Sequence, residues 1–567
     1  MLGSELVIRA LARRGVTTIF SLSGNQIMPL YDACIDANIR IVHVRHEAAA
    51  VFMADAWSQV TGQIGVALLT AAPGIANGVA PLFSASQAES PVLVISGDSS
   101  VGEDGMGAFQ ELDQVAMTAP LTKWSHRVTD GKALVSAIDT ACATALADRC
   151  GPVHLALPFD VLTREAGLDA LPAPMPDPAP VAPELAAIDD IDAIADLLGS
   201  AQRPLILAGP TLCRARHRPT LDACSRALGT PIVPMESPRG LRDPSLGALA
   251  ESMAEADLIV LLGKRLDFTV GFGREAAIGK TARVVAIDPD EAMLERAQRL
   301  LGDRLAARCR AAVVPALEAL RRRSGVATPA RDAWLTRVAQ ACAERGAPAV
   351  APAPVPTAVP VPAPAAGPTS AATAAGIHPR ALCEAVDRFL RTAPTPILVC
   401  DGGEFGQWAQ AFCQAPVRII NGMSGAIGGG ICYAIAAKLA RPEATVVLLM
   451  GDGTAGFHLA EFDTAVRAGA ALVAVVGNDR RWNAEHVIQQ RSYGEDRLIG
   501  CTLSASARYD AAVAGLGGFG AAVDQLDALA PALDAATASG LPACINVQLD
   551  GKPAPTFART QSGASAH

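Results

Sequence analysis

The sequence predicts an α/β protein built from three doubly wound parallel-sheet domains. Short apolar runs alternate with segments of helical periodicity along most of the chain, as expected for parallel sheets covered by helices on both faces. Several runs end in glycine and acidic residues, as at Gly451-Asp452-Gly453, and such strand ends meet at one edge of a parallel sheet. The length of 567 residues suits about three domains of ~150 residues each.

Composition places the domain boundaries. Residues 172–183 are rich in proline and alanine and predict a first linker, while residues 347–375 carry no charge and predict an extended connector. We therefore expect a first domain at 1–185, a central domain at 186–344, a linker at 345–376, a third domain at 377–555 and a tail at 556–567.

The predicted strands follow one another with helical segments between them. After a helix near 5–14, the first domain should contain strands at 18–22, 41–47, 65–70, 91–97 and 151–158. The central domain should contain strands at 204–209, 258–263 and 284–288, and the third domain at 396–400, 446–450, 472–476 and 543–548. No G-x-G-x-x-G motif follows a central strand, so the sequence supplies no motif for a nucleotide there.

Composition also excludes several classes of protein. A net charge of −9 argues against nucleic-acid binding. No run of eighteen apolar residues and no basic leader segment occurs, so we expect a soluble cytoplasmic protein with no membrane contact. The 13 cysteines are scattered without a C-x-x-C pair, which indicates core residues in a reducing compartment.

The segment 446–482 carries the clearest chemical signal. Its first apolar run ends in Gly451-Asp452-Gly453-Thr454, and its second ends before Asp479. The glycines let the backbone approach phosphate oxygens, the next helix start offers free N–H groups, and the carboxylates are suitable Mg²⁺ ligands. On this fragment alone, an ordinary pair of turn glycines is an equal alternative.

The spacing between the two aspartates, 479 − 452 = 27, resembles the signature of thiamine-diphosphate (ThDP) enzymes, in which GDG is followed by Asn-Asn at this distance. Further stretches resemble acetolactate synthases, benzaldehyde lyase and related decarboxylases: RHEAAAVFMADAW from 45, FQELDQVAMTAP from 109, GPVHLALPFDV from 151 and NGMSGAIGGGI from 421. The resemblance implies ThDP and Mg²⁺ as cofactors, with Asp452, Asp479 and the carbonyl of Arg481 as metal ligands. This chain departs from the family pattern by carrying Asp at 479.

The resemblance also assigns the residues around the cofactor. Glu47 matches the glutamate that drives the imino tautomer of the aminopyrimidine, although a helix-first-turn acid is its structural alternative. Ile427 matches the residue that keeps the cofactor bent, and the carbonyl of Gly425 matches the acceptor for its exocyclic amine. The remaining cofactor-binding positions implied are Pro73, Asn77, Gly402, Gly403, Glu404, Gly451, Gly453 and Thr454.

Substrate-side residues are matched more loosely. Gln110 corresponds to a glutamine near the reacting carbons, with a surface polar residue as the alternative, and Gln26 stands where benzaldehyde lyase has a histidine. Arg265 and Asp267 lie where FAD-containing relatives contact their flavin. A strand-end ion pair explains them equally well, which leaves FAD binding open.

The resemblance implies a carboligase or lyase that acts on 2-keto acids or aldehydes through a C2 carbanion and an enamine, as acetolactate synthase does. The alternatives are an acyloin lyase or ligase like benzaldehyde lyase, and a lyase of the 2-hydroxyacyl-CoA or oxalyl-CoA type. A non-catalytic regulatory relative is motivated only by the altered metal position. In this family the cofactor lies between two chains, so we expect a homodimer or homotetramer.

Overall fold

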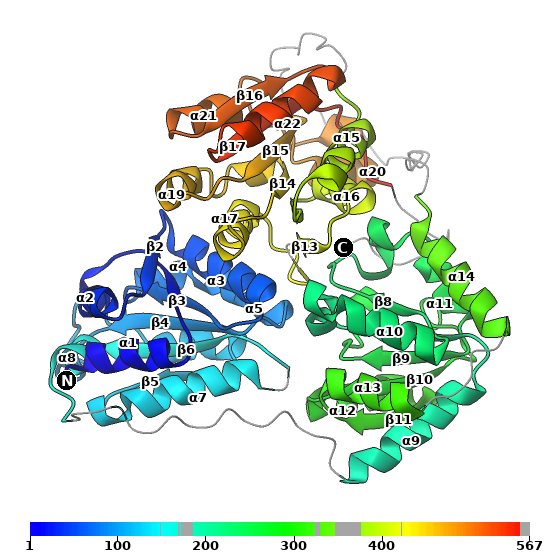
Figure 1. The fold of residues 1–567 in the computed structure, drawn as a ribbon, viewed down its shortest axis with the longest axis horizontal. Helices are drawn as coiled ribbons and strands as arrows, with labels where there is room; N and C mark the ends of the chain where they lie inside the picture. Colours follow the sequence, from blue (N-terminus) through cyan, green and yellow to red (C-terminus); the bar gives the residue numbers. More distant parts are fainter. Residues whose placement is uncertain are drawn as a thin grey trace.

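Three parallel sheets with helices packed against them form the chain (Figure 1), which confirms the predicted fold class. The computed structural model describes residues 1–147, 149–167, 171, 185–323, 329–345, 376–420 and 422–555. The predicted linker at 172–183, nearly all of the linker at 345–376 and the tail at 556–567 lie outside these ranges.

The first sheet has six strands in the order β2-β1-β3-β4-β6-β5. Its strands are β1 (Thr18–Ser21), β2 (Arg40–His43), β3 (Gly65–Leu69), β4 (Val92–Asp98), β5 (Ser125–Arg127) and β6 (Val153–Pro158). Its helices are α1 (Gly3–Arg13), α2 (Met28–Asp36), α3 (Glu47–Thr61), α4 (Pro73–Asn77), α5 (Val79–Gln87), α6 (Gln114–Thr118), α7 (Leu134–Leu146) and α8 (Phe159–Thr163).

The central sheet has five strands in the order β11-β10-β9-β7-β8. Its strands are β7 (Pro204–Ala208), β8 (Ile232–Pro234), β9 (Leu258–Leu262), β10 (Arg283–Asp288) and β11 (Leu305–Arg310). Its helices are α9 (Leu185–Ser200), α10 (Arg218–Leu228), α11 (Leu249–Glu255), α12 (Glu291–Leu301), α13 (Val313–Arg323) and α14 (Pro329–Ala343).

The third sheet repeats the strand order of the first, as β13-β12-β14-β15-β17-β16. Its strands are β12 (Ile397–Asp401), β13 (Val417–Ile420), β14 (Val446–Gly451), β15 (Val473–Asn478), β16 (Phe519–Val523) and β17 (Ala543–Gln548). Its helices are α15 (Pro379–Thr392), α16 (Glu404–Phe412), α17 (Gly430–Ala440), α18 (Asp452–Ala455), α19 (Glu461–Ala468), α20 (Asn483–Tyr493), α21 (Tyr509–Gly515) and α22 (Leu529–Ala538).

Every strand predicted from the sequence is present, but the prediction missed five strands. All five are edge strands of their sheets: β5, β8, β11, β13 and β16. The residues of β11, for example, are mostly half-exposed. An edge strand is not buried on all sides, so it does not need the continuous apolar run that identified the central strands.

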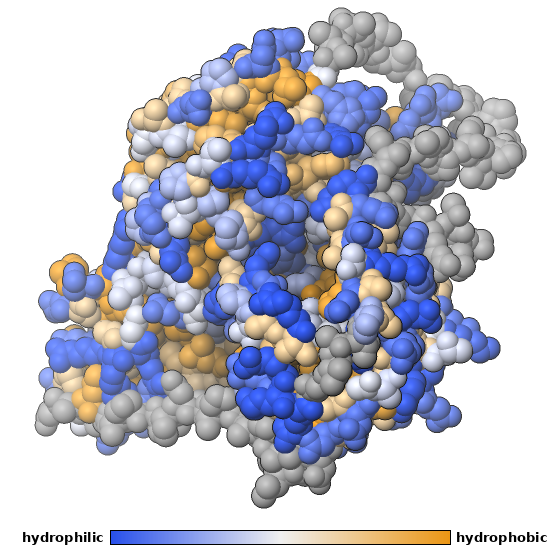
Figure 2. Space-filling model, turned by 45° about the vertical axis from the view of Figure 1, so that its right-hand side comes forward, coloured by the Kyte–Doolittle hydropathy of each residue, from blue (hydrophilic) through white to orange (hydrophobic). Residues whose placement is uncertain are grey.

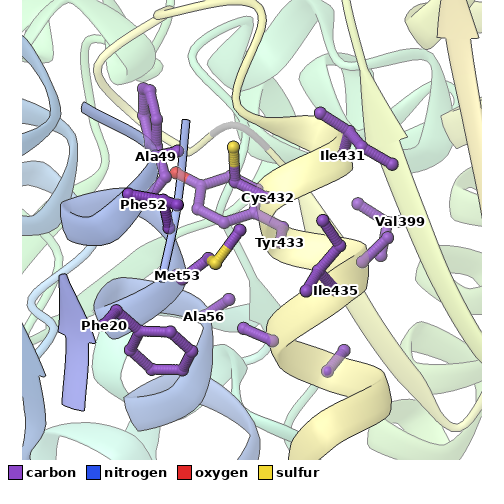
Figure 3. Packing of buried hydrophobic residues seen from close by; sticks show 14 of the residues in the cluster. Phe20, Ala49, Phe52, Met53, Ala56, Val399, Ile431, Cys432, Tyr433 and Ile435 are labelled. Carbon is purple, nitrogen blue, oxygen red and sulfur yellow. The ribbon is translucent and has the colours of Figure 1, made fainter. Parts of the chain in front are cut away.

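The first and third domains share one hydrophobic core. Helix α3 lies against α17, and Figure 3 shows Phe52 and Met53 of α3 facing Tyr433 of α17, while Ile435 lies on the side of α17 towards Val399. The rings of Phe52 and Tyr433 meet edge-to-face at 5.5 Å. The Tyr433 hydroxyl donates a hydrogen bond of 3.1 Å to the buried carboxyl of Asp55. These helices therefore join two domains that are distant in sequence.

The surface of the protein is mainly polar on the face that is drawn in Figure 2, with separate apolar patches. No helix in the described ranges is long and apolar enough to span a bilayer. All 13 cysteines lie within the described residues; none forms a disulfide there, and ten of them are buried.

The shared core predicts the effect of a truncation. Phe52→Ala should reduce the free energy of unfolding by about 3–5 kcal/mol, because a 5%-exposed ring that packs on both domains would leave a cavity. Urea denaturation measures this change. Phe268→Ala, at a ring that is 54% exposed, is the matched control and should change stability by less than about 1 kcal/mol. Equal losses in both variants would contradict a shared core.

Candidate active site

The strand order creates a crevice at the carboxyl end of the third sheet. The chain leaves β12 towards β13 on one side and leaves β14 towards β15 on the other, so the connections diverge between β12 and β14. Open α/β sheets bind ligands at such a switch point. Gly402 follows β12, Asp452 follows β14 and Asp479 follows β15, where Gly451 pairs with Gly477. The two aspartates therefore lie at one sheet edge, as predicted.

Asp452 and Asp479 form an unusual pair of acids. Asp452 is 3% exposed; its Oδ1 accepts a 3.0 Å bond from the Gly453 N–H, while its buried Oδ2 has no hydrogen-bond partner among the described residues. Burial raises the pKa of Asp452 to about 6. Burial and the neighbouring Asp452 carboxylate raise the pKa of Asp479 to about 7. Two acids that disfavour each other's charge suit a site for a cation.

The donor set fits a magnesium ion. Mg²⁺ prefers oxygen ligands and uses only one or two carboxylates, together with water or phosphate oxygens. Within the described ranges, no group of three His, Cys, Asp or Glu side chains could hold a metal, so further ligands must come from elsewhere. The carbonyl of Arg481 is available on the same turn as Asp479. The N–H of Arg481 donates a 3.1 Å bond to Asp479 Oδ1.

Glycines make a close-fitting cradle beside this acid pair. Gly402 has φ +105°, and a Cβ there would lie 3.1 Å from the Thr454 methyl group. A Cβ on Gly403 would lie 2.9 Å from Ala484, and one on Gly453 would lie 2.7 Å from the Trp482 ring. The backbone is thus tightly packed at three points beside the acid pair, and its N–H groups suit a bound diphosphate.

The side chain of Glu404 is engaged by the protein itself. The predicted diphosphate contact at this position can come only from the backbone, because Glu404 Oε1 accepts the N–H of Ala554. Burial raises the pKa of this carboxyl. The segment 552–554 is held against α16 by a second bond, because the Lys552 carbonyl accepts a 3.0 Å bond from Trp408 Nε1. No sequence motif pointed to residues 552–554 as part of this region.

Asp401 organises the glycine-rich loop that contains Gly425 and Ile427. Its buried carboxyl accepts bonds from the N–H groups of Gly428 and Gly430, at 3.0 and 2.7 Å. Burial raises the pKa of Asp401 to about 6. Gly425 has φ +68°, and the Ile427 side chain is only half-buried at the start of the loop's turn into α17. Asp401 is therefore a supporting residue that the resemblance did not assign.

Glu47 lies at the first position of α3, with its carboxyl half-buried. The Asn77 side-chain amide donates a 2.9 Å bond to Glu47 Oε2. Helix α4 brings Pro73 and Asn77 to this place, and a Cβ on Gly74 would lie 3.8 Å from Glu47 Oε1. The structure thus places Glu47 beside the helix that carries Pro73 and Asn77, two of the predicted cofactor-binding positions. The direct bond between Glu47 and Asn77 was not predicted.

The two predicted substrate-side glutamines lie in different settings. Gln26 is buried, and its Oε1 accepts a 2.9 Å bond from the Thr70 hydroxyl. Gln110 has φ +61°, a strained conformation outside glycine, and its buried Oε1 has no hydrogen-bond partner among the described residues. Gln110 therefore has an unused acceptor, while the Gln26 carbonyl is already occupied.

The central domain shows internal bonds at the predicted flavin-contact residues. Arg265 donates to Gln87 at 3.1 Å, and Asp267 accepts from Lys264 and from the Thr269 N–H. Arg149 crosses from the first domain to bond Glu89 and Asp288. The bonds of Arg265 and Arg149 to Gln87 and Asp288 cross the domain boundary, whereas Asp267 bonds within its own domain, so nothing in these residues points to FAD.

Fold and site geometry together suit an enzyme that binds a diphosphate-bearing cofactor at the carboxyl end of the third sheet. The chain belongs to the thiamine pyrophosphate enzyme family, thiamine pyrophosphate being a synonym of ThDP. The model of the N-terminal TPP-binding domain matches residues 1–117, that of the central domain 191–304, and that of the C-terminal TPP-binding domain 401–547. These matches place the chain among enzymes that form or cleave carbon–carbon bonds.

Two curated relatives are similar over nearly the whole chain. The acetolactate synthase large subunit of Mycobacterium tuberculosis is 32% identical over 563 residues, covering 97% of this chain and 96% of that protein. Human 2-hydroxyacyl-CoA lyase 2 is 30% identical over 564 residues, covering 91% and 84%. The structure of a ThDP-dependent 4-hydroxybenzoylformate decarboxylase from Rhodococcus jostii superposes with a TM-score of 0.78 at 22% identity, covering 97% of this chain and 99% of that one. That superposition supports the fold.

The acid pair predicts a dependence of stability on pH in the absence of metal. A carboxyl with a raised pKa binds its proton more tightly when folded, so stability should fall as pH rises from about 4 to 7. Asp479→Asn removes one charge of the pair, and should raise the free energy of unfolding at pH 8 by roughly 1–2 kcal/mol and leave it nearly unchanged at pH 4. Urea denaturation in EDTA at both pH values measures the difference.

The matched control is Asp496→Asn, at an exposed acid, which should leave both values unchanged. If Asp479→Asn gave the same pH dependence as the wild type, the two aspartates would not repel each other in the folded protein.

Proposed function

We propose that this protein is a ThDP- and Mg²⁺-dependent carboligase or lyase that acts on 2-keto acids or aldehydes. The observation that carries the proposal is the pair Asp452 and Asp479 beside a glycine cradle at the switch point of the third sheet. When bound, ThDP supplies a nucleophilic carbon that adds to a carbonyl group and accepts the electron pair released when a neighbouring bond breaks.

The third domain would hold the diphosphate end of the cofactor. Mg²⁺ would be bound by Asp452, Asp479 and the carbonyl of Arg481. The Oδ2 of Asp452, which has no hydrogen-bond partner among the described residues, would be one of the metal ligands. The N–H groups around Gly403 and Gly453, at the starts of α16 and α18, would donate to the phosphate oxygens. The further cofactor-binding positions are Gly402, Gly451 and Thr454, with Glu404 contributing through its backbone.

The first domain would supply the acid. Glu47 would share a proton with a ring nitrogen of the aminopyrimidine, and the amide of Asn77 would hold the carboxyl in place through its 2.9 Å bond. In this arrangement the Gly425 carbonyl would accept the exocyclic amine, and Ile427 would support the ring. A half-buried carboxyl at a helix start is well suited to exchange a proton with a bound ligand.

Pyruvate is the first substrate proposed. Acetolactate, named in the M. tuberculosis relative, is the product of joining two pyruvate units with loss of CO₂. A second candidate is the cleavage of a 2-hydroxyacyl-CoA, favoured by the relatives named 2-hydroxyacyl-CoA lyase 2. Acyloin cleavage, as in benzaldehyde lyase, is the third. Gln110, with its unpartnered oxygen, is the substrate-side group proposed in each case, and Gln26 a supporting one.

One set of incubations separates these reactions. Protein with ThDP and Mg²⁺ is supplied in turn with pyruvate, a 2-hydroxyacyl-CoA and benzoin, and products are identified by mass spectrometry. Acetolactate from pyruvate supports the first reaction, and an aldehyde with a shortened CoA product supports the second. The absence of turnover on every 2-keto acid, acyloin and CoA thioester tested would contradict the proposed function.

Replacing the proposed acid should abolish turnover but spare cofactor binding. Glu47→Gln should lower kcat about 10²–10⁴-fold, because the amide cannot exchange the proton. The Kd for ThDP by calorimetry should change less than about threefold, since one hydrogen bond is replaced by another. Glu291→Gln, at the first position of α12, is the matched control and should keep full activity. A fully active Glu47→Gln variant would contradict the assignment.

We further propose that the site forms between two chains of a homodimer or homotetramer. The family pattern divides the site between Glu47 of one chain and the metal-binding turn of another. Glu47→Gln and Asp452→Ala should each be inactive, but co-refolding them should restore about a quarter of wild-type activity through mixed dimers. A mixture that stays inactive, or an active monomer by light scattering, would contradict the division.

A further inference from the structure

The segment 457–461 of the third domain contacts the chain that presents Glu47. It follows the turn that contains Asp452 and ends at the start of α19. One of its residues, Glu461, contacts the backbone just before Glu47, and another, His458, contacts the Gly428 loop. A single short segment therefore contacts both the backbone before Glu47 and the Gly428 loop of the same chain.

Glu461 is a buried carboxyl, 1% exposed, that holds two consecutive peptide groups. Its Oε1 accepts bonds from the N–H groups of Arg45, at 2.9 Å, and His46, at 3.1 Å. Its Oε2 accepts the Thr464 hydroxyl at 2.6 Å. Arg45 and His46 immediately precede Glu47, so these bonds set the direction in which the chain enters α3.

The neighbouring residues hold the same short stretch from both ends. Arg467 donates a 2.8 Å bond to the His43 carbonyl, at the end of β2, and another to the Thr464 hydroxyl. His46 is the N-cap of α3, and its Nδ1 accepts the N–H of Ala48 at 3.1 Å. The backbone from the end of β2 to the start of α3 is thus fixed largely by α19.

His458 extends this contact to the Gly428 loop. Its Nδ1 lies 2.8 Å from the Gly428 carbonyl, and its ring meets the rings of His46, at 5.9 Å, and Phe52, at 5.7 Å. Gly428 is in turn bonded to Asp401. The loop bearing Ile427 and the helix bearing Glu47 are therefore packed against one imidazole.

We propose that Glu461 is a positioning residue for Glu47. Its carboxylate fixes the two peptides before Glu47, so that the Glu47 carboxyl is held where it can exchange a proton with the cofactor. The inference rests on the proposed function of Glu47. Because a displacement of about 1 Å can lower a rate about 10²-fold, loss of this anchor should affect turnover more than cofactor binding.

The test compares Glu461→Ala with the conservative Glu461→Gln in the full-length protein. The glutamine keeps an oxygen that can accept both N–H groups but removes the charge. Asp463→Asn is the matched control on the same helix, since among the described residues the Asp463 carboxylate pairs with the side chains of Arg45 and Arg467 and not with the backbone before Glu47. The readouts are kcat, the Kd for ThDP, the deuterium exchange of the C2 proton of bound ThDP by NMR, and amide exchange of peptides spanning 44–50.

In Glu461→Ala we expect a 10- to 100-fold lower kcat, slower C2 exchange and faster amide exchange at 44–50, with the Kd for ThDP changed less than about threefold. Glu461→Gln should keep at least about a third of kcat, and the control should match the wild type. Unchanged amide exchange in Glu461→Ala, or a Gln variant as impaired as Ala, would overturn the inference. A wild-type protein without C2 exchange would instead refute the proposed function, while the amide-exchange result would still decide the anchoring.

Discussion

Two neighbouring carboxylates at the ends of adjacent parallel strands impose the strongest constraint on this molecule. Asp452 and Asp479 follow β14 and β15, and the register of the two strands brings them to one edge of the sheet. Each raises the cost of the other's charge, and one buried oxygen is left without a partner. A cation would relieve both costs, which supports the proposed metal site at this pair.

Other parts of the third domain pack around the turns that carry Asp452 and Asp479. At positions 402, 403 and 453 the neighbouring residues leave little room for a side chain, so glycine allows the backbone to pack closely beside the acid pair. Asp401 fixes the loop at 428–430 with a carboxyl that is itself buried. The shared core of α3 and α17 then brings the first domain, with Glu47 at the head of α3, against the third. The packing that stabilises the fold thus also fixes the first and third domains relative to each other within one chain.

The sequence predicted the fold class and every central strand because strands buried on both faces require continuous apolar runs. The five missed strands lie at or near sheet edges, where that requirement is relaxed. Asp452 and Asp479 could be placed from the sequence because GDG and a fixed spacing mark them. Asp401, Glu461 and Ala554 could not be identified from the sequence. Their roles depend on bonds between a side chain and a backbone group far away in the chain, and such bonds leave no local pattern.

The same limit applies to the chemistry of the site. Sequence could match Glu47 to a family role, but only the fold shows that Asn77 bonds its carboxyl and that α19 holds the chain before it. Family membership is established by similarity along the whole chain, whereas the roles of Glu47, Gln110 and the acid pair are proposals. At the positions considered for a flavin, Arg265 pairs with Glu89 of the first domain, and Asp267 pairs with Lys264 of its own domain.

Calorimetric titration of ThDP into the metal-free protein, with and without Mg²⁺, tests the central claim most directly. We predict binding in the presence of Mg²⁺, strong weakening in EDTA, and no recovery by Mg²⁺ in an Asp452→Ala variant. Equal ThDP affinity in EDTA and in Mg²⁺, or normal binding by Asp452→Ala, would contradict a metal-bridged diphosphate at this pair of aspartates.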